Sequence, residues 1–277
     1  MSMKKGSILI FTLWALIILA ILSVILSSRA STDINLARHE SMNTKAYYLA
    51  KAGAMKMLAE LIKDAGENSH DSLDEDWNRD EDNPKELTLR GDRILYGASD
   101  EMAKLNLNSN FLTREHLIKL GIEESLAENI LEYKNAKVGK GARAFEFIEE
   151  LFLVKGLSPE AYSALKDLVT IYGDDASRVN INTASQEVLL AVIEDVTAAN
   201  FIIDEKEEGR VFNNIDEVHD AILQSFGVEI DKNILDVRSD IFRIWTQVRL
   251  SESEEIAEEI ETVVDRTTGR FLHWKEY

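Results

Sequence analysis

Hydrophobic residues are most concentrated near the N-terminus. Nearly every position of the nineteen from Ile8 to Leu26 is apolar, and Lys4 and Lys5 precede this run. A helix of that length rises roughly 28 Å, about the thickness of the hydrocarbon core of a bilayer. A secretory signal that is removed usually has a shorter apolar region of roughly 7–15 residues. Because flanking lysines stay in the cytoplasm, the pattern predicts one transmembrane helix, residues 7–27, with a cytoplasmic N-terminus and the rest of the chain outside the cytoplasm.

Beyond this run the pattern becomes amphipathic without a break. No proline occurs before Pro84, and glycine, which often ends helices, occurs at Gly66. Spacing of three and four residues is typical of a helix that packs one face on a domain. We therefore expect one continuous helix of about 55 residues, apolar all round in its first half and amphipathic in its second. The apolar positions with this spacing are Tyr47, Ala50, Ala54, Leu58 and Leu61.

Strand patterns lie on both sides of a long helical block. A short strand is expected at "RILYGASD", after an acidic linker, and residues 111–234 have helical spacing interrupted by short loops. Near the C-terminus "SDIFRIWTQVRL" alternates, and "EEIETVVDRT" and "RFLHWKEY" follow. Alternation of β-branched and aromatic residues predicts strands. The order of these elements predicts an α+β fold in which a helical domain, residues 109–235, is inserted into a small antiparallel sheet.

The helical block contains an internal repeat. "KLNLNSNFLTREHL" is echoed by "RVNINTASQEVL" 74 residues later, and "FEFIEEL" by "FNNIDEV" 67 residues later. Asparagine and threonine at the start of each copy suit turns and helix N-caps. A duplicated packing unit without a site of its own is the simpler interpretation of the repeat. The cap and turn candidates are Asn106, Asn108 and Thr113 in the first copy, and Asn180, Asn182 and Thr183 in the second.

Composition limits the partners that the chain can have. Its 50 acidic and 31 basic residues give a formal charge of −19, and there is no cysteine. Such a charge repels phosphate backbones, so nucleic acid is not expected as a partner. Disulfides and thiolate metal sites are excluded. The five histidines are scattered without a metal-binding pair, and no nucleophile elbow or phosphate-binding loop occurs, so we do not expect an enzyme.

The N-terminal sequence "KKGSILIF" resembles the site at which prepilin peptidase cuts type IV pilins and pseudopilins. The resemblance implies removal of a leader, residues 1–6, by cleavage after Gly6. Ser7 would then be the mature N-terminus, and the apolar helix would be kept as both signal and anchor. The resemblance also implies a pilin-like fold, with the long helix packed on the sheet.

The fifth residue of that mature chain is Phe11, where most pilins and pseudopilins have a glutamate. This departure resembles one family, protein K of the type II (general) secretion pathway. "DSLDEDW", "SDEMAKLNLN", "VNINTAS" and "VVDRTTGRFLHWKEY" resemble segments of that family in order. The resemblance implies a pseudopilin domain formed by residues 28–108 and 236–277, with residues 109–235 inserted. It also implies an inner-membrane subunit with a periplasmic domain, at the tip of the pseudopilus, which binds minor pseudopilins of the I and J types.

The repeats also resemble helix-hairpin-helix units of DNA-binding proteins. The second copy reads "IEDVTAAN" at the hairpin, with acids and no glycine, and the first keeps only Leu120-Gly121-Ile122. The phosphate clasp is therefore missing. A membrane-anchored DNA-binding protein of the competence type stays an alternative function, and a minor pilin of a type IV pilus is another.

The acidic linker offers candidate calcium ligands. Carboxylates at every second position have the ligand spacing of a calcium loop. Arg79 stands where an EF-hand needs glycine, and Lys85 stands where it needs glutamate. We therefore expect calcium in another geometry, as the resemblance to protein K also implies, or a solvated acidic loop without a metal. The candidate ligands are Asp74, Asp76, Asp80 and Asp82.

Overall fold

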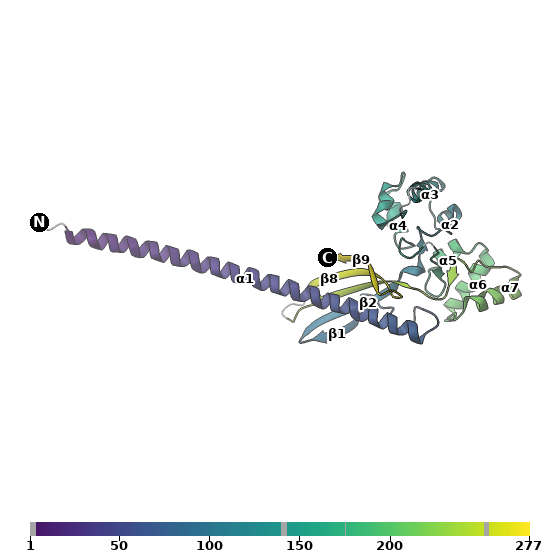
Figure 1. Cartoon of the computed structure of the whole chain (residues 1–277), viewed down its shortest axis with the longest axis horizontal. Coiled ribbons are helices and arrows are strands. Elements are labelled where there is room, and N and C mark those ends of the chain that lie inside the picture. Colours follow the sequence, from purple (N-terminus) through teal and green to yellow (C-terminus); the bar gives the residue numbers. More distant parts are fainter. Residues whose placement is uncertain (1–3, 140–142, 175, 252–254) are drawn as a thin grey trace. The chain divides into compact units, whose positions relative to one another are not determined.

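The computed structural model describes residues 4–139, 143–174, 176–251 and 255–277, with side chains described from Leu9 onward. The chain forms two compact units, which divide between Leu49 and Ala50. The first unit is the N-terminal part of one long helix. The second contains the end of that helix, a five-stranded sheet and a helical insertion (Figure 1).

The long helix α1 spans Lys4–Glu67, which is 64 residues. Its end is one residue beyond the stop predicted at Gly66, and it contains no break. The prediction of one continuous helix is therefore confirmed, and the helix is longer than expected because it begins before the apolar run.

The sheet is antiparallel, with the strand order β1-β2-β7-β8-β9. β2 and β7 pair along their length, with Ile94 opposite Val248 and Tyr96 opposite Thr246. The chain leaves the sheet after β2 and returns with β7, so the helical insertion lies between two neighbouring strands. The strands are β1 (Lys85–Leu89), β2 (Asp92–Asp100), β7 (Ile241–Arg249), β8 (Ile256–Asp265) and β9 (Arg270–Glu276).

The end of α1 packs on this sheet through small and apolar residues. A Cβ at Gly53 would lie 2.8 Å from Ile94 Cγ2 and 3.2 Å from Thr246 Cγ2. Glycine therefore allows the helix backbone to approach β2 and β7 closely, although glycine weakens a helix by itself. Ala50, Ala54 and Leu61 are fully buried, as the apolar spacing predicts.

The insertion consists of short helices and two small parallel strand pairs. Leu105 pairs with Val169 and Val179 pairs with Leu235, so each pair closes one copy of the sequence repeat. Spacing alone indicated helices here and missed these two-residue strands. The elements of the first copy are β3 (Leu105–Asn106), α2 (Arg114–Lys119), α3 (Glu124–Val138), the 3-10 helix Ile148–Leu153, α4 (Pro159–Leu165) and β4 (Val169–Thr170); those of the second are β5 (Val179–Asn180), α5 (Gln186–Val192), α6 (Val196–Glu207), α7 (Ile215–Phe226) and β6 (Leu235–Asp236).

The insertion has a hydrophobic core of its own, which extends from Leu105 to Val237 through both copies. Phe145, Ile130, Ile181 and Leu189 are among its fully buried members. Burial of one such side chain contributes roughly 1.5–3 kcal/mol. Two repeat units thus share one core, as expected for a duplicated unit that cannot bury its apolar face alone.

The acidic segment after α1 is more ordered than the predicted linker. Its last residues form β1, which pairs with β2, and Trp77 is buried with its ring 5.0 Å from that of Phe242. Arg79 lies so close to β2 that a Cβ at Gly97 would be 2.3 Å from the Arg79 carbonyl oxygen. The charge pattern suggested a solvated loop, but one tryptophan and this glycine bring part of the segment against the sheet.

Candidate functional site: an exposed apolar helix and a buried polar junction

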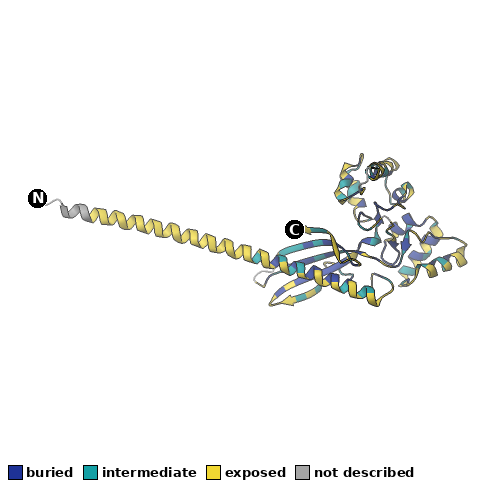
Figure 2. Cartoon of the chain, viewed as in Figure 1, coloured by how far each residue is buried: buried dark blue, intermediate teal, exposed yellow. Residues whose placement is uncertain are grey.

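The N-terminal part of α1 presents its apolar side chains to the surroundings. Leu9 is 74% exposed, Phe11 78% and Trp14 62%, and Figure 2 shows exposed residues along this part of the helix from Leu9 onward. In length and composition α1 is the one helix of the described chain that could cross a membrane, with a mean hydropathy of 3.0 over its most apolar window. Exposure of such a surface to water is unfavourable, which is consistent with a helix that anchors the chain in a membrane.

Polar groups in and just after the apolar run bond within the helix. The Thr12 hydroxyl donates to the Leu9 carbonyl at 2.9 Å, and the Thr32 hydroxyl donates to the Ser28 carbonyl at 3.0 Å. A hydroxyl bonded in this way can enter hydrocarbon at little cost. The local structure therefore suits a helix that spans a membrane.

The predicted processing residues lie at the start of this helix. Gly6 and Ser7 are within α1, where the structure describes the backbone only, and residues 1–3 of the predicted leader lie outside the described residues. Phe11 follows one turn later, and no carboxylate occurs before Asp33.

The predicted calcium ligands are dispersed, and some already have partners. Asp76 forms ion pairs with Lys85 and Arg79, at 2.7 Å to the latter, and these bonds hold the pKa of its carboxyl below the usual value. Asp80 accepts a hydrogen bond from the backbone N–H of Asn83 at 2.9 Å. In the part of the chain that the structure describes, no three acidic groups from Asp74, Asp76, Asp80 and Asp82 bring their oxygens together. Calcium binding by these residues stays a prediction, and it would require the segment to rearrange.

Three other acids converge. Oxygens of Asp64, Asp71 and Glu75 lie within 4.8 Å of one another. Burial raises the pKa of Asp64 and of Glu75, and the charge of Asp71 adds to the effect. Arg266 supplies the nearest positive charge, with bonds of 2.6 and 2.7 Å to the two oxygens of Asp71. This cluster could bind a cation, but Arg266 already occupies the Asp71 side of it.

The pair of Asp71 and Arg266 is buried, at 0% and 4% exposure, and joins residues 195 positions apart. The guanidinium carbon of Arg266 also lies 5.0 Å from the ring centre of Phe242. The second oxygen of Asp71 accepts a further bond from the Ser239 backbone N–H at 2.8 Å. Since a buried carboxylate is costly without such partners, Arg266 and Ser239 together fix the start of the acidic segment to the base of β7.

Asp100, at the end of β2, is the centre of a second buried network. Its carboxylate accepts hydrogen bonds from the hydroxyls of Thr183 and Ser239, both at 2.5 Å, and from the Asn180 amide at 3.2 Å. Burial raises the pKa of Asp100 to about 6, against the opposing effect of these donors. Thr183, expected in a turn or at a helix cap, lies in the turn before α5 and bonds to Asp100 of the sheet, and Ser185 caps α5.

Glu101, the next residue, is also buried but has the opposite electrostatics. Burial by itself would raise its pKa, but the charges of Lys104 and Arg243 and their bonds lower it to about 2. Arg243 Nε lies 2.6 Å from one oxygen, and the Thr170 hydroxyl donates to the other at 2.6 Å. Glu101 thus connects β7 with β4 of the first copy.

Each copy of the repeat contains the same pair of hydrogen bonds between an asparagine side chain and the backbone of a phenylalanine, here called the asparagine clamp. The Asn108 amide nitrogen donates to the Phe145 carbonyl at 2.9 Å, and its oxygen accepts from the Phe145 N–H at 2.9 Å. Asn182 and Phe212 make the same two bonds, at 2.8 and 2.9 Å. Offsets of 74 and 67 residues relate these partners, as they relate the matched sequence segments. The predicted turn role of both asparagines is confirmed, and Thr113 caps α2 as predicted.

No protein-family model matches the sequence, and a search of the curated proteins finds no significant match. The structure is similar to a chain in the crystal structure of the GspK-GspI-GspJ complex from the type 2 secretion system of enterotoxigenic Escherichia coli. The TM-score is 0.65 at 16% sequence identity, and the alignment covers 87% of this chain and 99% of that chain. At this identity the match shows the fold: a long N-terminal helix, an antiparallel sheet and a helical insertion, in a pilin-like α+β arrangement. The resemblance indicated by the sequence motifs is confirmed at that level.

Proposed function

We propose that this chain is a minor pseudopilin of the protein K type, which caps the tip of a type II secretion pseudopilus and helps to start its assembly. The fold match carries the proposal, since the aligned chain belongs to a pseudopilin complex and is covered almost completely. The exposed apolar helix supports it, because a fibre subunit needs a surface that can exchange lipid for partner helices.

Phe11 supports a place at the tip. In related subunits a glutamate at this position would pair with the N-terminus of a neighbour, and a charge in hydrocarbon is costly without a partner. A subunit with phenylalanine needs no such partner on that side. Together with the large insertion between β2 and β7, this absence favours the end of a fibre over its interior.

The proposed partners are minor pseudopilins of the I and J types, since the similar chain was crystallised in a complex of GspK with GspI and GspJ. In this proposal the chain is a single-pass inner-membrane protein with its C-terminal unit in the periplasm. Copurification of the full chain from membranes, followed by mass spectrometry of its partners, tests the assignment. Recovery of type IV pilus components alone would favour the alternative of a minor pilin.

Processing at Gly6 provides the sharpest test. We expect the mature chain to begin at Ser7, and Gly6→Leu to prevent both cleavage and secretion. Gly66→Ala is the matched control, because nothing lies within 4 Å of a Cβ at that glycine. Normal maturation of the Gly6→Leu variant, or a mature N-terminus near Ala30, would refute the proposal.

We also propose that the chain binds calcium through its acidic segment. Thermal unfolding of the full chain should shift upward with added calcium and less so in Asp80→Asn/Asp82→Asn. A shift lost only in Glu75→Gln would place the ion at the cluster of Asp64, Asp71 and Glu75 instead. An unchanged unfolding temperature would exclude both positions.

A further inference from the structure

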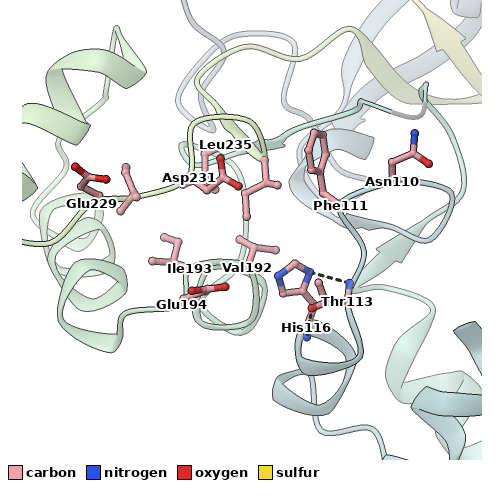
Figure 3. Close-up of a pocket in the computed structure, with 12 residues that line it drawn as sticks. Asn110, Phe111, Thr113, His116, Val192, Ile193, Glu194, Glu229, Asp231 and Leu235 are labelled. Carbon is pink, nitrogen blue, oxygen red and sulfur yellow. Dashed lines mark hydrogen bonds between the residues drawn. The ribbon is translucent and has the colours of Figure 1, made fainter.

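A cavity of about 640 Å³ lies at the seam between the two copies of the repeat (Figure 3). Asn110, Phe111 and His116 approach it from the first copy, and the chain after α5 and the chain before β6 approach it from the second. Its volume is within the range of sites that bind small ligands or single peptide segments. It lies in the insertion, and no described residue of α1 lines it.

His116 places an unused hydrogen-bond donor at this cavity. Its side chain is more than nine-tenths buried, and its Nδ1 accepts a hydrogen bond from the backbone N–H of Thr113. An Nδ1 that accepts leaves the proton on Nε2 in the neutral ring. Burial lowers the pKa of His116, and the nearby charge of Lys119 lowers it further against the opposing charge of Glu194, so the neutral ring is favoured at pH 7. Nε2 has no partner among the described residues, and Figure 3 shows that edge of the ring turned towards the cavity.

The rim of the cavity is acidic. Glu194 and Glu229 are exposed there and bond to no described side chain, while Asp231 uses one oxygen to cap the turn at Asn233. No lysine or arginine is among the described residues that line the cavity. Lys119 lies behind it and donates to the carbonyls of Ile193 and Glu194. The carboxylates and His116 do not converge on one point as metal ligands do, so the arrangement suits an extended cationic ligand better than a single ion.

Apart from Asn110 and Thr113, the remaining lining is apolar and includes Phe111, Val192 and Ile230. We propose that this cavity binds an extended basic segment of a partner polypeptide. Lysine or arginine side chains of that segment lie against the carboxylates of Glu194 and Glu229, with their aliphatic stems on the apolar lining. A backbone carbonyl of the same segment accepts the Nε2–H of His116. Both halves of the site are needed, since carboxylates alone select charge and the His116 donor selects a peptide group.

The test uses the full chain in a neutral detergent and the fluorescein-labelled peptide Gly-Ala-Arg-Ala-Lys-Ala-Gly, with fluorescence anisotropy at physiological ionic strength. We expect Glu194→Gln/Glu229→Gln to weaken binding about tenfold. Glu207→Gln/Glu217→Gln removes the same charge from exposed positions outside the cavity and should change the Kd less than about twofold. A peptide with glutamine in place of arginine and lysine should bind about tenfold more weakly.

Equal losses in the two double variants would overturn the proposal, because general attraction to a chain of charge −19 would then explain binding. Absence of binding, or displacement of the peptide by calcium but not by magnesium at matched ionic strength, would also overturn it. His116→Asn keeps an acceptor for Thr113 and removes the Nε2 donor, so it should weaken binding several-fold. If that variant does not fold, the ring resonances of His116 in the unsubstituted chain decide the point: a shift on peptide addition supports the contact, and unchanged resonances refute it.

Discussion

The two copies of the repeat have the same internal clamp but are attached to the sheet in different ways. Glu101 connects the first copy, through the Thr170 hydroxyl, and is paired with Arg243 and Lys104. Asp100 connects the second copy, through Thr183 and Asn180, and has no positively charged partner within ion-pair distance among the described residues. Adjacent carboxylates thus have pKa values of about 2 and about 6.

The first asparagine of each copy shows the same contrast. The Asn106 amide donates to the Tyr172 and Asp174 carbonyls of its own copy. The equivalent Asn180 amide donates out of its copy, to the Asp71 carbonyl, to Asp100 and to the Ser239 hydroxyl. Duplication therefore preserved the contacts that fold each unit, while the contacts that attach a unit to the sheet are specific to its position.

Loss of Arg266 should have the largest effect on the stability of the fold. Arg266→Ala leaves Asp71 buried without its charge partner, which should lower the free energy of unfolding by about 4 kcal/mol. Urea unfolding followed by circular dichroism measures this. Arg270→Ala, at an exposed position in β9, is the control and should change little; similar losses in both variants would contradict the assigned role of the pair.

The two adjacent carboxylates should give opposite pH dependences. Asp100 has a raised native pKa, so its ionisation costs about 3 kcal/mol above pH 6, and this cost disappears as the pH falls from about 6 to 4. Glu101 has a lowered native pKa, so it stabilises the fold above about pH 4.5, and that contribution disappears as the pH falls to about 2.

The cost of ionising Asp100 can be isolated by measuring the unfolding of the unsubstituted chain and of Asp100→Asn from pH 7 to pH 4. The difference in free energy of unfolding should change by about 3 kcal/mol over this range, in favour of the unsubstituted chain at low pH. A difference that is independent of pH would show that Asp100 is not desolvated as the structure indicates.

The clamps should contribute comparably, with a somewhat larger loss for Asn108, whose amide also donates to the Ile171 carbonyl at 2.8 Å. Asn108→Ala and Asn182→Ala each leave buried backbone groups of a phenylalanine without partners, so each should lower the free energy of unfolding by about 2 kcal/mol. Asn129→Ala, which removes a bond on an exposed surface, is the matched control. A clearly larger loss in Asn182→Ala than in Asn108→Ala would contradict this assignment.

The smallest expected difference in stability is between variants of Asn106 and Asn180, the first asparagine of each copy. Asn180→Ala removes bonds to the sheet and its flanking segments, whereas Asn106→Ala removes bonds within one copy, so we expect the former to cost about 1 kcal/mol more. Hydrogen exchange should rise on both sides of the junction in Asn180→Ala, and only within the first copy in Asn106→Ala. The reverse pattern would contradict the proposed attachment.

Local patterns predicted the elements whose signals are local. Hydropathy indicated α1, alternation indicated β7, β8 and β9, and the repeat indicated where Asn108 and Asn182 occur. The same patterns missed β1 and the two-residue strands, because such short pairs gain their stability from a neighbouring strand. They also left open whether Thr183 belongs to a turn or caps a helix, since a threonine before a helix does not show whether its hydroxyl faces the helix or another element.

The candidate sites show the same distinction between features predicted from the order of residues and features that depend on tertiary contacts. The predicted processing residues Gly6 and Ser7, and the exposed Phe11, were identified from their order along the chain. The calcium ligands were expected from the spacing of acids, but Asp76 pairs with Lys85 and Arg79, and the acids that do converge include Asp64, which lies in α1. The spacing of carboxylates along the chain does not show which lysine and arginine side chains pair with them in the folded structure.

The sequence by itself determined a long helix with an apolar surface, a sheet interrupted by a helical insertion, and a duplication inside that insertion. Only the tertiary structure decided that Asp71 pairs with Arg266, that Asp100 and Glu101 bond to different copies of the repeat, and that His116 faces an acidic cavity. The physical reason is that helix and strand patterns depend on neighbouring residues, whereas the state of a buried charge depends on groups that folding brings together from distant positions.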